Sequence, residues 1–178
     1  MTLSNKDQQF INIAAEEAMS SDCLMQHGCV AVLNGKVIGR GFNHLCNSTS
    51  DGFVVENQYS CHAEVSALRE AFYKINGCNS CNRSIKYPKH SKDKIENLKK
   101  LIIYVVRVDS KSNKLKNSAP CIDCVKMMSD LNIKRVVFSD EHDDFQKVKP
   151  KNYEVKFTTY ARRPCSIYNE RRICSIYN

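Results

Sequence analysis

Two short stretches of the sequence combine the side chains that a reactive metal centre needs. His62 and Glu64 lie two residues apart in the first, while Cys121 and Cys124 lie three residues apart in the second, directly after Pro120. Imidazoles and thiolates are common zinc ligands, and zinc sites that do chemistry usually take three protein ligands and leave a fourth position for water. We therefore expect His62, Cys121 and Cys124 to bind Zn²⁺. Glu64 would then be free to move protons.

Each stretch is expected to open a helix, one over residues 61–76 and the other over residues 121–130. On a helix, Cys121 and Cys124 fall on one face and can bind a single ion. Pro120 suits the first helical position, because its missing N–H would have no partner there. The free N–H groups and the positive end of the helix dipole favour the thiolate form of nearby cysteines.

Each motif alone has a simpler explanation. An H-x-E stretch often arises by chance, and a lone C-x-x-C is often half of a structural zinc site. In the middle of a helix His62 and Glu64 would diverge, but at a helix start both can reach a site beyond its end. Because the two motifs occur in this order, with Pro120 before the first cysteine, we favour a catalytic zinc centre.

The pattern H-x-E…P-C-x-x-C is the signature of zinc-dependent nucleobase deaminases, and residues 5–160 resemble the cytidine and deoxycytidylate deaminase superfamily. This resemblance implies an α/β chain with a three-layer α/β/α fold, a mixed sheet of about five strands and helices on both faces. It implies Zn²⁺ as cofactor and Glu64 as the catalytic proton shuttle. It further implies that Asn43 binds the substrate sugar, and that the N–H of Ala63 and the carbonyl of Ala119 hold the base.

Hydrophobic patterns and turn residues predict the elements that would carry this site. Near-continuous apolar runs predict buried strands, and the short connections through the second motif predict that the last two of these strands are parallel. The Asn-Gly dipeptide predicts a two-residue hairpin turn. The expected elements are a helix over 5–20, strands over 27–33 and 36–40 around that turn, strands over 101–108 and 134–139, and an edge strand over 153–159.

Asn43 has an alternative role, because asparagine often closes a loop with its own side chain. The neighbouring His44 could pair with a phosphate group, although a surface histidine is the simpler interpretation. The sequence leaves both questions open.

From length and composition we expect one domain and no membrane-spanning segment. The chain has 178 residues, and we divide it into a deaminase domain over 1–160 and a basic tail over 161–178 that repeats itself with a period of nine and is expected to be disordered. No apolar run approaches the roughly 20 residues that cross a bilayer. Ten cysteines without a visible secretory signal favour reduced thiols, and hence a cytoplasmic location.

A basic insertion over 77–99 lengthens the gap between the two motifs. It contains Cys78, Cys81 and His90, which could form a second, structural zinc site, although other cysteines of the chain are equally eligible ligands. With a net charge of +8, the chain would attract nucleotide phosphates or a nucleic-acid backbone, but a lysine-rich loop can also be merely solvated.

The favoured function is deamination of a cytosine nucleotide such as dCMP, with a small-molecule nucleotide as substrate and self-association into a homo-oligomer. The second choice is editing of a nucleic acid, either adenosine in tRNA or cytosine in a polynucleotide. A third interpretation, from a different class, is an inactive zinc-bound domain that serves as a binding module. The intact Glu64 argues against this third interpretation, because a purely structural site does not need it.

Overall fold

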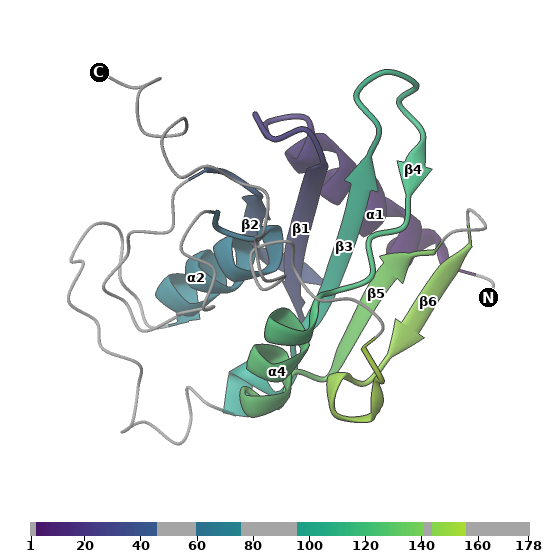
Figure 1. Ribbon diagram of the computed structural model, residues 1–178. Helices are drawn as coiled ribbons and strands as arrows, with labels where there is room; N and C mark the ends of the chain where they lie inside the picture. Colours follow the sequence, from purple (N-terminus) through teal and green to yellow (C-terminus); the bar gives the residue numbers. More distant parts are fainter. Residues whose placement is uncertain (1–2, 46–59, 76–95, 141–143, 156–178) are drawn as a thin grey trace.

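The computed structural model describes residues 3–45, 60–75, 96–140 and 144–155, and these form one mixed sheet between helices (Figure 1). Within these residues, no helix is long and apolar enough to cross a membrane. The sheet has the strand order β2-β1-β3-β5-β6, and a short strand, β4, pairs with β3 outside this path. Only β3 and β5 pair in parallel among the described strands, as expected for strands joined through a helix. The strands are β1 (Gln26–Leu33), β2 (Lys36–Phe42), β3 (Ile102–Val108), β4 (Leu115–Lys116), β5 (Arg135–Ser139) and β6 (Phe145–Val148).

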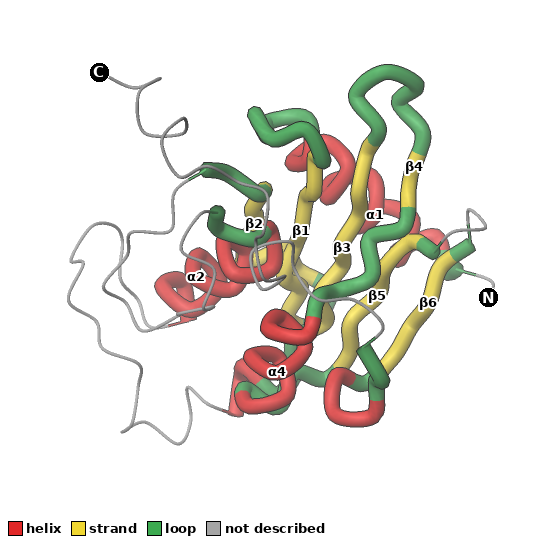
Figure 2. The backbone as a smooth tube through the Cα atoms, viewed as in Figure 1, coloured by secondary structure: helices red, strands yellow, loops and turns green. Residues whose placement is uncertain are grey.

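Helices cover both faces of the sheet, which confirms the predicted three-layer α/β/α arrangement. Helix α1 (Asn5–Ala18) lies behind the strands in Figure 2, and α2 (Ala63–Ile75) and α4 (Ile122–Asp130) lie in front of them. Two separate apolar cores result. Two successive residues of β3 show the division. Val105 packs in the core under α2 and α4, whereas Val106 packs in the core under α1.

The β1–β2 hairpin has the turn that its sequence predicts. Leu33 pairs with Lys36, and both intervening residues have positive φ, 50° at Asn34 and 76° at Gly35. Two consecutive positive φ values characterise the type I′ turn, whose twist matches that of the flanking strands.

Two glycines of β2 let α2 lie directly on the sheet. A Cβ atom added at Gly39 would come within 2.1 Å of the carbonyl oxygen of Ala67, and one added at Gly41 would come within 2.4 Å of the Ala67 nitrogen. Real Cβ atoms do not approach the backbone that closely, so any larger residue would push α2 away. The glycines therefore set the height of the helix whose first turn carries Glu64.

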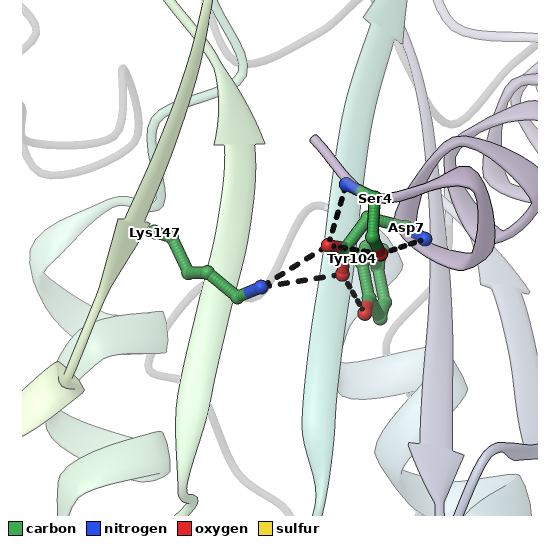
Figure 3. A network of polar contacts seen from close by, with 4 residues as sticks. All are labelled: Ser4, Asp7, Tyr104 and Lys147. Atoms are coloured by element: carbon green, nitrogen blue, oxygen red, sulfur yellow. Dashed lines mark hydrogen bonds and ion pairs between the residues drawn. The ribbon is translucent and has the colours of Figure 1, made fainter. Parts of the chain in front are cut away.

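On the other face, a buried carboxylate ties α1 to the sheet (Figure 3). Asp7 and Ser4 form a reciprocal capping box at the start of α1. The same carboxylate accepts a hydrogen bond of 2.6 Å from the Tyr104 hydroxyl on β3 and forms an ion pair of 3.2 Å with Lys147 on β6. One side chain of α1 thus holds two strands that are distant in the sequence.

The structure differs from the sequence-based prediction at the edge of the sheet. The predicted edge strand over 153–159 is wrong over its described part, since residues 153–155 form no strand and the rest lies outside the described residues. The edge strand is β6, and a 3₁₀ turn, η1 (Pro150–Asn152), follows it. Pro150 has no N–H to donate, so it favours a turn over continued pairing. The side chain of Tyr153 packs instead against the ring of Phe138.

Helix boundaries also differ slightly. Helix α4 begins at Ile122 with Cys121 as its N-cap, so Pro120 lies one residue before the cap rather than at the first helical position. Helix α1 ends at Ala18, two residues before the predicted end. The basic insertion and the repeated tail lie outside the described residues, apart from the last residues of the insertion, which include the buried Leu98.

Candidate metal centre

The first residues of α2 and α4 meet on the same face of the sheet. His62 directly precedes α2, and its carbonyl accepts the N–H of Ser66 at 3.0 Å. Cys121 is the N-cap of α4, and its carbonyl accepts the N–H of Val125 at 2.9 Å. Each helix therefore presents its N-terminus, where the first N–H groups have no partner within the helix and the dipole has its positive end, to the same place.

Three side chains converge there. The Nδ1 atom of His62 lies 3.3 Å from the Sγ of Cys124 and 3.5 Å from the Sγ of Cys121. All three candidate ligand atoms lie within 4.8 Å of one another, and no other group of this kind occurs in the described part of the chain. Tetrahedral zinc with its usual bond lengths would hold a nitrogen and a sulfur ligand about 3.6 Å apart. The cluster fits a zinc ion in both donor type and spacing.

Proton sharing within the cluster shows how strongly its members interact. Burial lowers the pKa of His62, but the hydrogen bond with Cys121 and the negative charges nearby outweigh burial and raise it to about 9. The hydrogen bond with Cys124 is the main cause that lowers the pKa of Cys121 to about 4. The same bond, together with burial, raises the pKa of Cys124 well above its ordinary value. Metal ligands must be deprotonated, so a cation would take the place of the shared protons.

Glu64 lies beside this cluster without belonging to it. It is in the first turn of α2, and its side chain is buried, with 5% of its surface exposed. Burial is the main cause that raises the pKa of this carboxyl group, and the charge of His62 opposes the rise. A raised pKa makes the carboxylate a better proton acceptor than a free one, which suits a group that must take up and return protons.

The structure places the other predicted site residues as follows. Ala63 is the fully buried first residue of α2, and Ala119 precedes Pro120 at the approach to α4, where its N–H bonds to the side chain of Asn117 at 2.9 Å. Their assignments to the base stay predictions. The candidates for a second zinc site, Cys78, Cys81 and His90, lie outside the described residues.

Asn43 follows β2 and has its side chain bound to the protein itself. Its Oδ1 accepts the N–H of His27 at 2.7 Å and the hydroxyl of Ser21 at 2.7 Å, and its Nδ2 donates to the carbonyl of Met25 at 2.8 Å. These bonds fix the start of β1, which corresponds to the loop-closing alternative. The role of Asn43 toward a sugar stays a prediction. His44 joins Cys61, next to His62, through a pair of backbone hydrogen bonds.

Cys29, a buried residue of β1, was predicted only as an eligible ligand of a second zinc site, and sequence reasoning did not place it beside this centre. Burial and the charge of Glu64 raise the pKa of the Cys29 thiol well above its ordinary value. The charge of Cys29 in turn contributes to the raised pKa of Cys124. The alternation of β1 could have shown which face it occupies, but not that the metal centre lies over that face.

Comparison with known proteins agrees with this centre. Residues 4–140 match the cytidine and deoxycytidylate deaminase zinc-binding region. None of the curated proteins matches the sequence. Three solved structures illustrate the range of similar proteins: the dCMP deaminase from the cyanophage S-TIM5 in apo form (22% identity, 80% of this chain and 88% of that chain covered, TM-score 0.47), the cytidine deaminase from Burkholderia pseudomallei (19%, 83% and 94%, 0.48) and the guanine deaminase from Bacillus subtilis (22%, 80% and 66%, 0.43).

The matched region spans most of the chain and contains both helix starts that form the His62, Cys121 and Cys124 cluster. The chain belongs to the family defined by the cytidine and deoxycytidylate deaminase zinc-binding region.

Proposed function

We propose that the protein is a zinc-dependent hydrolytic deaminase that converts a cytosine nucleotide, dCMP or a close relative, to the uracil nucleotide with release of ammonia. The observation that carries this proposal is the convergence of His62, Cys121 and Cys124 beside the buried carboxyl group of Glu64. The three ligand atoms match zinc, and the fourth group is an acid–base residue that zinc does not need for binding. A purely structural zinc site would leave Glu64 without a role.

Glu64 would carry the protons of the reaction. A zinc ion held by His62, Cys121 and Cys124 would lower the pKa of water toward neutrality and so supply the nucleophile for attack on C4 of the base. The Glu64 carboxylate would take the water proton, pass it to the ring nitrogen and later assist the departure of ammonia. Its buried position favours this shuttle, because burial raises the carboxyl pKa and excludes competing solvent.

Net charge supports a phosphorylated substrate. The chain carries a net charge of +8, which favours an anionic substrate over a neutral nucleoside. The same charge favours the second candidate, deamination of adenosine in tRNA or of cytosine in a polynucleotide. Because Cys121 and Cys124 must be reduced to bind a metal, we place the protein in a reducing compartment such as the cytoplasm. We also propose a homo-oligomer, which light scattering showing only a 20.4 kDa species would contradict.

A substrate panel tests the proposed function. Zinc-loaded protein is incubated with cytidine, deoxycytidine, CMP, dCMP, tRNA and a single-stranded DNA, and ammonia release is measured. We expect the highest kcat/KM with dCMP. Turnover of the polynucleotides alone would move the assignment to nucleic-acid editing, and absence of turnover with all six substrates would contradict a deaminase function.

A further inference from the structure

Three basic side chains form a row across neighbouring strands beside the metal centre. His27 at the start of β1 pairs with Arg107 on β3, and Arg107 pairs in turn with Lys116 on β4. Neighbouring strands lie about 4.8 Å apart, so the three Cα atoms span roughly 10 Å. Sequence reasoning missed this row, because its members are distant in the sequence and the short strand β4 was not predicted.

The row lies on the face of the sheet that carries the metal centre. Residues directly opposite each other on paired strands share a face, and successive residues of one strand alternate. Cys29 and Val105 pack in the core under α2 and α4, so their second neighbours His27 and Arg107 are on that same face. Leu115 packs on the opposite side, in the core under α1, which leaves Lys116 on the face of Arg107.

His27 interacts electrostatically with both the row and the metal centre. Burial is the main cause that lowers its pKa to about 4, and the charges of Arg107 and His62 lower it further. The negative charge of Cys121 instead raises the pKa of His27. Charges of the row and of the cluster thus both act on the His27 ring, which belongs to the same face of the sheet as the metal centre.

Arg107 is the unusual member. Its side chain is half-buried, yet no ion pair or hydrogen bond of this side chain occurs within residues 3–45, 60–75, 96–140 and 144–155. A guanidinium group offers five donors, which suit the oxygens of a phosphate group. The carboxylate of Asp109, two residues along the chain, already accepts the N–H groups of Lys111 and Ser112.

We propose that Arg107 and Lys116, with His27 beside them, form a subsite for the phosphate group of the substrate. The inference rests on the proposed function, and it deepens that function by naming the residues that would distinguish a nucleotide from a nucleoside. Arg107 would supply a bidentate contact to the phosphate group, and the exposed Lys116 would add a second positive charge at the end of the row.

Binding measurements test the subsite separately from turnover. Zinc-loaded Glu64→Gln protein, in which turnover is suppressed, is titrated by calorimetry with deoxycytidine, with dCMP and with a single-stranded oligonucleotide that contains one cytosine. The titrations are repeated after adding Arg107→Gln or Lys116→Gln. Lys36→Gln is the matched control, because Lys36 is an exposed lysine at the other end of the β1–β2 hairpin and its loss changes the net charge equally.

We expect dCMP to bind at least tenfold more tightly than deoxycytidine, Arg107→Gln to remove most of this preference, and Lys36→Gln to retain it. A preference for the oligonucleotide that Arg107→Gln removes would also support the subsite and would assign it to a polynucleotide phosphate. Equal affinities for all three ligands, or a preference that survives both Arg107→Gln and Lys116→Gln, would overturn the proposal. If Arg107→Gln does not fold, Lys116→Gln provides the test, because Lys116 is exposed. We then expect Lys116→Gln to reduce the preference for dCMP over deoxycytidine by about threefold or more. Failure of the substrate panel contradicts the deaminase function alone, since these affinities do not depend on turnover.

Discussion

Replacing Asp7 by asparagine should reveal a pH-dependent contribution to stability. Asp7 is buried, and its carboxylate binds Ser4, Tyr104 and Lys147 on three separate elements (Figure 3). Burial raises the pKa of this carboxyl group, but the hydrogen bonds from Tyr104, Ser4 and Lys147 together outweigh burial and lower the pKa from 3.8 to about 2. The folded state therefore favours the ionised form.

The magnitude follows from linkage between protonation and folding. Each pKa unit corresponds to about 1.4 kcal/mol, so a fall from 3.8 to about 2 stabilises the fold by about 2 kcal/mol. Because the folded pKa is depressed, this contribution is fully present above the unfolded value near pH 4. It is lost as the pH falls through the folded value near 2. Asp7→Asn should therefore lower the free energy of unfolding by about 2 kcal/mol at neutral pH.

Urea unfolding followed by circular dichroism measures this difference. The free energies of unfolding of the original protein and Asp7→Asn are compared at pH 7 and at steps down to about pH 2.5, where the difference should fall below half of its neutral value. Glu16→Gln is the control, because Glu16 is an exposed carboxyl group on the same helix. A difference below about 0.5 kcal/mol at pH 7, or one that does not change with pH, would refute the reasoning.

Two further predictions concern the metal centre. Glu64→Gln should keep the fold and the metal while lowering kcat by about 10²–10⁴-fold, because it keeps the size of the side chain and removes its titrating group; a variant with full deaminase activity would place the proton shuttle elsewhere. Gly41→Ala should lower the melting temperature and the zinc content together, because its Cβ would lie 2.4 Å from the Ala67 nitrogen and 2.9 Å from the Ala63 carbonyl oxygen in the first turns of α2; unchanged zinc content and stability would show that α2 tolerates the shift.

The two motifs that supply the candidate metal ligands and Glu64 were recognisable in the sequence because their spacing is local. Each motif lies within about one turn at the start of a single helix, His62 with Glu64 in one and Cys121 with Cys124 in the other. The spacing in the sequence therefore predicts how the two side chains of each motif are arranged. The Asn34-Gly35 turn and the apolar runs of β1, β3 and β5 are local signals too, and the structure confirms them. These signals were sufficient for the three-layer arrangement.

Features that depend on long-range pairing were not predictable. The two-residue strand β4 has no apolar pattern of its own and exists only through its pairing with β3. The edge strand was placed too late, because the alternation at 153–159 resembles a strand as closely as β6 does and only the turn at Pro150 separates them. The row of His27, Arg107 and Lys116 requires the strand register, which a single sequence does not contain.

The most direct test of the zinc centre is the zinc content of the purified, folded protein and of Cys121→Ala measured side by side. We predict that Cys121→Ala binds one zinc ion per chain fewer than the original protein, because it removes one of three ligands from a single site. A folded original protein without zinc, or a Cys121→Ala variant with undiminished zinc content, would contradict the assignment of His62, Cys121 and Cys124 as the metal ligands.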